Sequence, residues 1–559
     1  MNMKKGLPVV FGAIVGGVLG TLVLPVGFIS GHGTGWSLPW HDLNMYLITW
    51  EYYVHDQWRF PLLNLPAMGY PEGGNVLFTD ALPIGQLVSK VIHSVSGHAI
   101  NPFGWWILVT YVLQGVMAVR IVRAAGVRSV YAAISAAVIA TAFFPFMSRV
   151  WHVAVSSHFM ILWALAVYLE ITRQRKLPIG ELLALSVVSI LVNAYLVVMV
   201  MLLLAAAVIT VSKERALSRR EWIQLLVVIL GTTAVAGIVG YGALLFGVHS
   251  LEGEGFGYFS WNPITLIVPP PLLWGHPSNA LRFGTGGQYE GDSYIGVGAL
   301  IIVVGSLVFL RSHVAPAMRR HWPLVIVLIC FGAFAASNEV YIGRFHVLHI
   351  HLPPAILKAA GMFRSSGRFI WAPAYALSLF SLAALFKWGR RALVVPIVLI
   401  AVVLQLYEVR RLGREVRRTY DSAAPAFVNT AQVRLWMLGH ARVFQFPSWG
   451  CGGLSAKPED PTVSSLSELQ INLTAARLGL ATNTVYTSRL VKDCGAESQW
   501  PEKPEMDDGT LYLLNKRRVN TTAQLAALAN SSRCVDAEWG LVCSRQHLMP
   551  PIANSPEQQ

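Results

Sequence analysis

The chain has 559 residues, of which 54% are hydrophobic and only 13% are charged, and its mean hydropathy of +0.52 excludes a wholly soluble globular protein. Its net charge of +14 does not indicate nucleic-acid binding, because most lysines and arginines stand in short segments between apolar runs. There they orient spans and contact anionic lipid. The apolar runs are about 17–25 residues long, which matches the bilayer core and predicts a polytopic α-helical membrane protein.

The chain begins with Lys4 and Lys5 followed by an apolar run over 7–29. The two lysines predict a cytoplasmic N-terminus. A cleaved signal peptide is the alternative, but the run contains no convincing small-x-small cleavage site, which favours a retained signal anchor.

Length and positive charge together predict about eleven transmembrane helices. The stretch 179–211 has basic clusters at both ends, so two short spans bent at Asn193-Ala194-Tyr195 satisfy the charge rule better than one span does. The predicted spans are 7–27, 103–121, 129–147, 153–171, two within 179–211, 222–247, 294–310, 322–337, 367–386 and 392–408. The outside loops are then 28–102, 248–293 and 338–366, and a membrane module over 1–410 precedes an extracytoplasmic domain over 411–559.

The segment after residue 411 mixes short apolar runs with turn residues, which is typical of a small soluble α/β or α+β domain. It holds four cysteines, and their even number indicates two disulfides and an oxidising compartment, with the pairing left open. Free thiols and a zinc site are the alternatives. The four are Cys451, Cys494, Cys534 and Cys543. Cys330 lies in an apolar run and is interpreted as an inert core residue.

Five arginines between Arg410 and Arg418 follow the last predicted span and would lie outside, against the charge rule. We interpret them as an amphipathic helix that rests on the outer leaflet or packs against the C-terminal domain.

The first outside loop carries acids among many aromatic residues. Asp42 can act as a general base for an acceptor hydroxyl or hold a divalent cation against a phosphate. Asp80 precedes a predicted membrane-surface helix, and an N-cap is its alternative role. Glu51 and Asp56 are too far from Asp42 to share a helical turn with it, and solvated or salt-bridged roles remain open for both.

Two later loops add charged and aromatic residues. Arg364 and Arg368 stand just before a span on the outer side, where guanidinium groups suit phosphate recognition and contact with lipid head groups is the alternative. Glu290 lies among aromatic residues of the preceding loop. The histidines between His346 and His351 are spaced like metal ligands, although an interfacial loop explains them equally well.

Three strings resemble an uncharacterised bacterial membrane family that is similar to the GT-C superfamily of glycosyltransferases. They run from Gly69-Tyr70-Pro71 to Asp80-Ala81-Leu82-Pro83, from Tyr289 to Gly296, and from Phe363 to Trp371. The resemblance implies a polyprenyl-phosphate sugar as donor and transfer on the outer face of the plasma membrane. It also implies that Asp42 is a base or metal ligand and that Arg364 and Arg368 hold the lipid phosphate. Asn193-Ala194-Tyr195 departs from the His-Pro-Tyr type break of relatives, which puts any role of that histidine in doubt.

The sequence hypothesis is therefore a bacterial inner-membrane enzyme that passes a sugar to a glycan, lipid or protein acceptor, with Mg²⁺ or Mn²⁺ as a candidate cofactor. The alternative is a non-catalytic transporter or assembly protein for lipid-linked glycans; the absence of internal repeats and the acids in outside loops favour the enzyme. Catalysis is assigned to Asp42 and Asp80. Substrate binding is assigned to His41, Glu51, Asp56, Tyr70, Glu290, Tyr294, Arg364 and Arg368.

Overall fold

A computed structural model describes residues 3–40, 42–79, 82–149, 151–242, 255–274, 281–454, 465–484, 486–487, 494, 506–515, 534–546 and 548. The chain divides into two compact units. The first comprises residues 1–33, 103–235 and 252–421, and the second comprises 34–102, 236–251 and 422–559. Each unit is described by itself.

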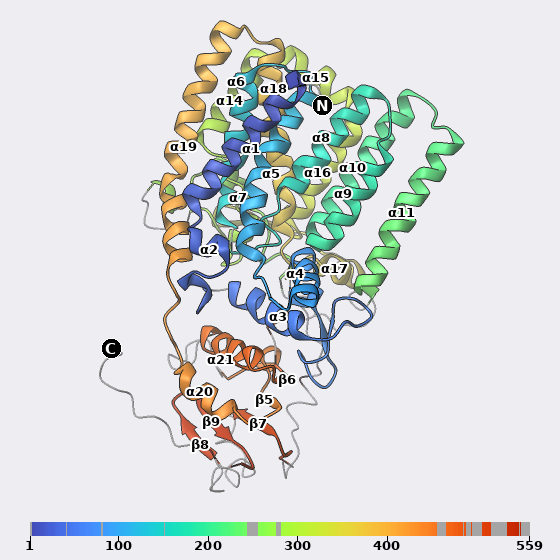
Figure 1. Ribbon diagram of the computed structural model, residues 1–559. Coiled ribbons are helices and arrows are strands. Elements are labelled where there is room, and N and C mark those ends of the chain that lie inside the picture. The colour runs from blue at the N-terminus through green and yellow to red at the C-terminus, as the bar shows by residue number, and fades with distance from the viewer. Residues whose placement is uncertain are drawn as a thin grey trace. The chain divides into compact units, whose positions relative to one another are not determined.

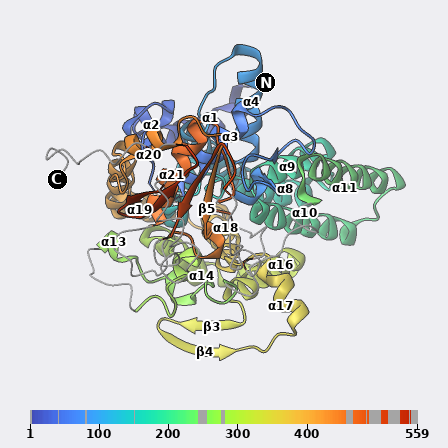
Figure 2. The same ribbon diagram turned by 90° about the horizontal axis from the view of Figure 1, so that it is seen from below.

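The first unit is a bundle of apolar helices (Figure 1). Its α-helices are α1 (Met3–Val23), α2 (Val26–Ser30), α5 (Phe103–Ala124), α6 (Val130–Thr141), α7 (Phe144–Ser148), α8 (Phe159–Gln174), α9 (Ile179–Val192), α10 (Ala194–Glu214), α11 (Arg219–Val239, whose end belongs to the second unit), α13 (Pro271–Trp274), α14 (Val297–Phe309), α15 (Arg311–Arg320), α16 (Trp322–Ala336), α17 (Pro354–Gly361), α18 (Trp371–Trp388) and α19 (Arg391–Asp421). Short 3₁₀ helices η3 (Pro263–Leu266), η4 (Gln288–Gly291) and η5 (Ser366–Ile370) lie in its loops, and β3 (Glu339–Ile342) pairs with β4 (Phe345–His349) in an antiparallel hairpin, seen in Figure 2.

A helix lies at the place of each predicted span. Six of the described helices are long and apolar enough to cross a membrane, or seven if the bent pair α14 and α15 is one span. The chain is therefore a multi-pass membrane protein. The count of eleven stays a prediction, because α9 and α16 are shorter apolar helices.

Glycines bring α1 and α5 into backbone contact. A Cβ on Gly12 would lie 2.7 Å from the carbonyl oxygen of Gly115, and one on Gly16 would lie 2.1 Å from that of Tyr111. The spacing of Gly12 and Gly16 is the small-xxx-small pattern that lets membrane helices approach closely. Larger side chains at these positions would push the two helices apart.

The predicted break at Asn193 separates α9 from α10. Asn193 is extended, with φ −164° and ψ 138°, and its side chain accepts a hydrogen bond from the backbone N–H of Tyr195 at 2.9 Å. This bond caps the new helix by satisfying one of its free N–H groups.

The arginines from Arg410 to Arg418 lie in a helix, as predicted, and the placement of that helix on the outer leaflet stays a prediction. They belong to α19, which continues without a break to Asp421. Arg417 donates to the carbonyl oxygens of Thr21 and Leu22, both at 3.1 Å. These are carbonyls at the C-terminal end of α1, where intrahelical partners are missing and a cation is favourable.

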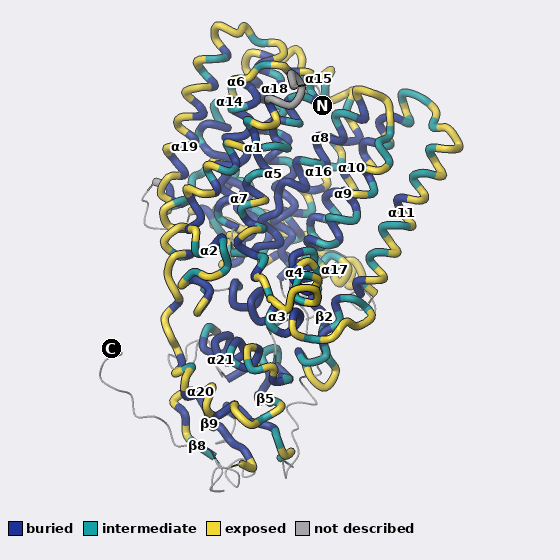
Figure 3. Tube along the Cα trace, in the orientation of Figure 1, coloured by how far each residue is buried: buried dark blue, intermediate teal, exposed yellow. Residues whose placement is uncertain are grey.

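The interpretation of Cys330 as a core residue is wrong. Its side chain is exposed on α16. An apolar run in a membrane helix faces lipid on one side as well as protein on the other, so the run does not predict burial. Figure 3 shows this mixture of buried and exposed positions along the outer helices.

The second unit combines the first outside loop with the C-terminal segment. Its elements are η1 (Thr34–Trp36), α3 (Leu43–His55), β1 (Asn64–Leu65), β2 (Gly74–Asn75), η2 (Val76–Thr79), α4 (Pro83–Ser96), α20 (Thr430–Met437), β5 (Arg442–Phe446), η6 (Trp449–Cys451), α21 (Ser465–Arg477), β6 (Ala481–Thr482), β7 (Thr510–Leu514), β8 (Cys534–Ala537) and β9 (Gly540–Cys543). The five-stranded sheet has the order β6-β5-β7-β9-β8. Strands β6, β5 and β7 are parallel, whereas β9 is antiparallel to both β7 and β8.

Contacts between the loop and the C-terminal segment build this unit. Tyr52 donates its hydroxyl to the carbonyl oxygen of Leu480 at 2.7 Å, and the backbone N–H groups of Gly69 and Tyr70 both donate to that of Thr482 at 2.8 Å. Almost every residue of α3 is buried, and α21 packs against it. The predicted boundary at 410 therefore does not coincide with the division between the units, since α3 is covered by residues far along the chain.

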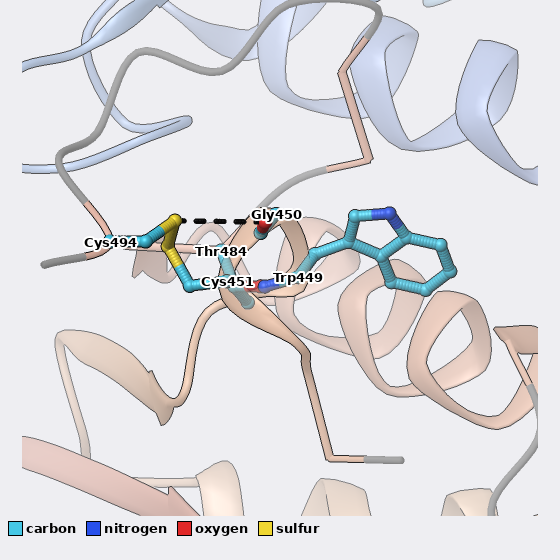
Figure 4. Close-up of a disulfide and its surroundings, with 5 residues drawn as sticks. All are labelled: Trp449, Gly450, Cys451, Thr484 and Cys494. Atoms are coloured by element: carbon cyan, nitrogen blue, oxygen red, sulfur yellow. Dashed lines mark hydrogen bonds between the residues drawn. A yellow bond between two sulfur atoms is a disulfide. The ribbon is translucent and has the colours of Figure 1, made fainter. Parts of the chain in front are cut away.

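The C-terminal cysteines form two disulfides in the structure, Cys451 with Cys494 and Cys534 with Cys543. Figure 4 shows the first beside the turn of η6, where the backbone N–H of Trp449 donates to the hydroxyl of Thr484 at 2.8 Å. The second joins the adjacent strands β8 and β9.

Opening the first disulfide is expected to destabilise the fold more than opening the second. The Cys451–Cys494 pair closes 43 residues and the Cys534–Cys543 pair closes 9. The loop-entropy relation then gives costs of about 4 and about 2.6 kcal/mol. Each variant replaces both cysteines of one pair by serine. Denaturant titration, with unfolding detected by limited proteolysis in the segment after residue 422, measures which variant loses more stability. A larger loss from the Cys534/Cys543 variant would contradict the expected order.

Candidate functional site

A buried cluster of charges surrounds Glu290 in the first unit. Glu290 lies in η4, only 3% exposed, and accepts a hydrogen bond from Nε of Arg368 at 2.9 Å. Nη1 of Arg149 and Nε2 of His152 lie 3.8 and 3.7 Å from its carboxylate oxygens. Burial raises the pKa of Glu290, but Arg368 and Arg149 outweigh it and hold the pKa well below the usual 4.5. Glu290 is therefore an anion at any physiological pH.

Two buried arginines contact Glu290. Arg149 and Arg368 are 6% exposed each, and the guanidinium of each approaches the same carboxylate. Arg149 also donates to the carbonyl oxygen of Tyr289, while its buried Nε has no hydrogen-bond partner within the described ranges. A buried N–H group without a partner is costly. The Nε of Arg149 is therefore available to donate to an anionic ligand.

Two glycines bring the loops of the cluster together. A Cβ on Gly367 would lie 2.6 Å from Cα of Gly291, and one on Gly291 would lie 2.7 Å from Cα of Trp261. These distances leave no room for any side chain, so glycine is required at both positions for Glu290 and Arg368 to meet.

The helix break at Asn193 places Tyr195 against the same cluster. The guanidinium of Arg368 lies 4.8 Å from the centre of the Tyr195 ring, and the hydroxyl of Tyr195 accepts a hydrogen bond from the backbone N–H of Ser365 at 3.1 Å. Arg364 is half-buried, and its guanidinium lies 5.6 Å from the ring centre of Phe259. No carboxylate pairs with Arg364 in the described part of the chain, which leaves its charge available to a ligand.

Tyr294 and Asp292, from the same loop as Glu290, make other contacts. Tyr294 donates its hydroxyl to Glu408 of α19 at 2.6 Å, and Asp292 accepts from Arg282 at 2.8 Å. All four side chains are buried. These pairs fix the loop to its surroundings and so support the position of Glu290.

The predicted site residues of the first outside loop belong to the second unit. Asp42 immediately precedes α3, is half-buried, and makes no hydrogen bond that caps the helix. Glu51 lies near the end of the same helix, where Arg477 and His55 each approach its carboxylate at 3.8 Å. Burial raises the pKa of Glu51, and the nearby Arg477 and His55 oppose this rise. His41 and Asp80 lie outside the described residues.

Asp56 and Tyr70 make contacts within the second unit. Asp56 ends α3 and accepts two hydrogen bonds from Arg59, at 2.8 and 3.1 Å. Tyr70 is exposed, and Nη1 of Arg442 donates to its hydroxyl at 3.3 Å. The structure therefore shows Asp56 in a salt bridge, one of the roles that the sequence left open.

The candidate metal ligands do not converge. His346 and His349 both contact Glu339 in the β3–β4 hairpin, at 2.8 and 2.5 Å. Among the described residues, no group of three histidine, cysteine or acidic side chains is placed to hold a metal ion. The Mg²⁺ or Mn²⁺ site expected around Asp42 stays a prediction, since His41 and Asp80 lie outside the described residues.

Three cluster members were not among the assigned site residues: Arg149, His152 and Tyr195. A signal for each was present in the sequence. Arg149 and His152 are ionisable groups near a predicted span end, a position that often marks a functional interior, and Tyr195 belongs to the predicted helix break.

A family model described as Domain of unknown function (DUF6311) matches residues 13–410. The chain belongs to this family. The match confirms the resemblance to an uncharacterised family, and it includes every member of the Glu290 cluster. The DUF6311 region ends before the C-terminal cysteines.

The solved structures that are similar to the DUF6311 chain include the two that follow. One is the oligosaccharyltransferase of Archaeoglobus fulgidus, tethered to an acceptor peptide with an NVT sequon, with a TM-score of 0.43, 11% identity and coverage of 90% of this chain and 67% of that one. The other is ArnT from Cupriavidus metallidurans in the apo state, with a TM-score of 0.45, 13% identity and coverage of 97% and 98%. No curated protein matches the sequence.

Proposed function

We propose that this protein transfers a sugar from a polyprenyl-phosphate donor to a glycan, lipid or protein acceptor on the outer face of a bacterial plasma membrane. The observation that carries the proposal is the pair of buried arginines at Glu290. Both contact its carboxylate, and the Nε of Arg149 is left without a partner within the described ranges. The phosphate of a lipid-linked sugar would accept a hydrogen bond from that nitrogen and place its negative charge beside the two guanidinium groups.

The arginines suit this ligand for two reasons. Guanidinium groups bind phosphate oxygens through paired hydrogen bonds and keep their charge when buried. During transfer, negative charge grows on the departing lipid phosphate, so fixed cations stabilise the transition state more than the ground state. We assign this role to Arg149, Arg364 and Arg368.

We propose that Asp42 acts on the acceptor. A carboxylate can accept the proton of an acceptor hydroxyl or amide as the new glycosidic bond forms to the sugar and the bond to phosphate breaks. Asp42 is half-buried at the start of α3. This assignment rests on the family resemblance.

One observation favours the alternative of a transporter for lipid-linked glycans. The interrupted helix pair α9 and α10 places Tyr195 beside Arg368, and transporters form substrate sites at discontinuous helices. Turnover distinguishes the two functions, because a transporter binds and moves the same lipid without consuming it.

The test is turnover by the purified full-length protein with a panel of polyprenyl-phosphate sugars. Removal of the free charge in Arg364→Gln is expected to raise KM for the donor by about tenfold, because a hydrogen bond to a charged group contributes roughly 1.5–3 kcal/mol and the site is only half-buried. Arg344→Gln is the matched control, since Arg344 is exposed and its guanidinium likewise lies near an aromatic ring, that of Phe345.

Consumption of any donor by the wild type supports the enzyme hypothesis if the donor KM is raised in Arg364→Gln and unchanged in Arg344→Gln. Saturable binding of donor without turnover, in a protein that retains its fold, would instead establish the transporter. Equal KM values for both variants would remove Arg364 from the donor site.

A further inference from the structure

A large cavity lies within the first unit, and no residue of the Glu290 cluster lines it. Its volume is about 720 Å³, within the range of roughly 300–1,000 Å³ typical of ligand sites. The walls come from α8, α14, α15, α16 and α18. Apolar side chains make up most of them, including Leu307, Leu324, Leu328, Ile329, Leu377 and Phe380.

The cavity continues onto a surface suited to lipid. Leu307 of α14 and Ile329 of α16 line it and are 51% and 63% exposed. Further large apolar side chains on the same two helices, Val304 and Ile326, are 55% and 48% exposed. Because a bilayer covers such faces in a membrane protein, the cavity is reached from the hydrocarbon phase.

Its charged residues are all cationic. Arg173, Arg320 and Lys387 line the cavity together with His313 and His321, and none of the lining residues is acidic. Arg320 has a carboxylate nearby, since Glu214 lies 3.6 Å away and is shared with Arg175. The cavity thus joins an apolar interior to a basic rim.

Two of these cations, Arg173 and Lys387, contact the same helix end. Arg173 donates to the carbonyl oxygens of Arg123 and Ala124 at 3.3 and 3.4 Å, and Lys387 donates to that of Ala125 at 3.3 Å. These carbonyls belong to the C-terminal end of α5 and the residue after it. In the described part of the chain, no carboxylate forms an ion pair with Arg173 or Lys387. Both side chains are exposed and retain N–H donors for another ligand.

Helix α15 frames this basic rim. It meets α14 at 95°, has no buried residue, and contains Arg311, Arg319 and Arg320. The ring of its His313 stacks on Trp388 at 4.9 Å between ring centres. A short basic helix that turns sharply from a span is typical of one lying along the membrane surface. The charge rule predicts that this end is cytoplasmic, where the leaflet is rich in anionic lipid.

We propose that this cavity binds an anionic phospholipid. Its acyl chains lie against α8, α16 and α18, and its phosphate lies against Arg173 and Lys387. The occupant follows from two features together. Basic pockets between membrane helices on the cytoplasmic side attract acidic head groups, and the mostly apolar walls suit acyl chains. The proposal is independent of the glycosyl-transfer hypothesis, because it uses none of its residues.

The test measures lipid binding to the full-length protein by native mass spectrometry after titration with phosphatidylglycerol or phosphatidylcholine. Wild type is expected to retain phosphatidylglycerol preferentially. Arg173→Gln/Lys387→Gln is expected to bind it about thirtyfold more weakly, because each lost charge contributes about fivefold. Arg311→Gln/Arg319→Gln is the matched control, since it removes the same charge from exposed positions that do not line the cavity.

A second variant separates lost binding from lost structure. Ala384→Trp adds volume to the cavity wall without changing charge and is expected to exclude the acyl chains. If Ala384→Trp no longer binds phosphatidylglycerol but elutes like the wild type on gel filtration, the result supports the site. Glycerol phosphate lacks acyl chains and should not displace the lipid.

Four results would overturn the proposal. They are equal binding of the two phospholipids, equal binding by wild type and both cavity variants, displacement by glycerol phosphate, and binding of polyprenyl phosphate to the exclusion of phosphatidylglycerol.

Discussion

Glu290→Gln is expected to lower the free energy of unfolding by about 3–5 kcal/mol, because it removes the buried carboxylate that both Arg149 and Arg368 contact. Titration with sodium dodecyl sulfate in mixed micelles measures the loss. Glu415→Gln is the control, since Glu415 is exposed on α19 and its replacement should change stability by less than about 0.5 kcal/mol.

The double variant Glu290→Gln/Arg368→Gln tests whether the two side chains act as a pair. Their hydrogen bond at 2.9 Å predicts that the double loss is smaller than the sum of the single losses, with a coupling of roughly 0.5–3 kcal/mol. Additive losses would mean that Glu290 is stabilised by something other than Arg368.

The same pair sets a pH dependence with a definite sign. The folded-state pKa of Glu290 lies below the usual 4.5, so the unfolded chain binds the proton first as pH falls. The contribution of Glu290 to stability is therefore fully present above about pH 5 and is lost as pH falls from 4.5 toward the folded-state value. The difference between wild type and Glu290→Gln should be constant from pH 6 to 8 and shrink below pH 4.5. A difference that grows in acid would contradict this assignment.

Hydrophobic runs and local charge predicted much of the bundle. A helix lies at the place of every expected span, and the basic clusters at both ends of 179–211 were enough to place the break at Asn193. These features depend on residues close together in the chain. The same rules misplaced Cys330, because hydropathy does not say which face of a helix contacts protein.

The pairings in the candidate site could not be predicted, since they join distant segments. Arg368 is 78 residues from Glu290, and Tyr294 is 114 from Glu408. In the second unit, Tyr52 bonds with Leu480 across 428 residues. No periodicity encodes such contacts. The composition of the Glu290 and Arg368 loops did mark them as unusual, but the choice of partner depends on packing at Gly291 and Gly367.

Asp42→Asn is expected to reduce kcat for sugar transfer by about 10²–10⁴, the range for loss of a general base. The amide keeps the size of the side chain but cannot accept a proton, and the residue makes no hydrogen bond that caps α3, so the helix should persist. Glu72→Gln provides the control, because it makes the same chemical change at an exposed position of the same loop.

The split between kcat and KM identifies the role of Asp42. A base that acts only as the bond forms lowers kcat and leaves donor binding unchanged, whereas a residue that merely holds the donor raises KM. Asp42→Glu should recover part of the activity, because it restores a carboxylate that is displaced by one methylene. Full activity of Asp42→Asn would instead show that sugar transfer does not depend on this carboxylate, and it would leave the arginines around Glu290 as the remaining part of the proposal.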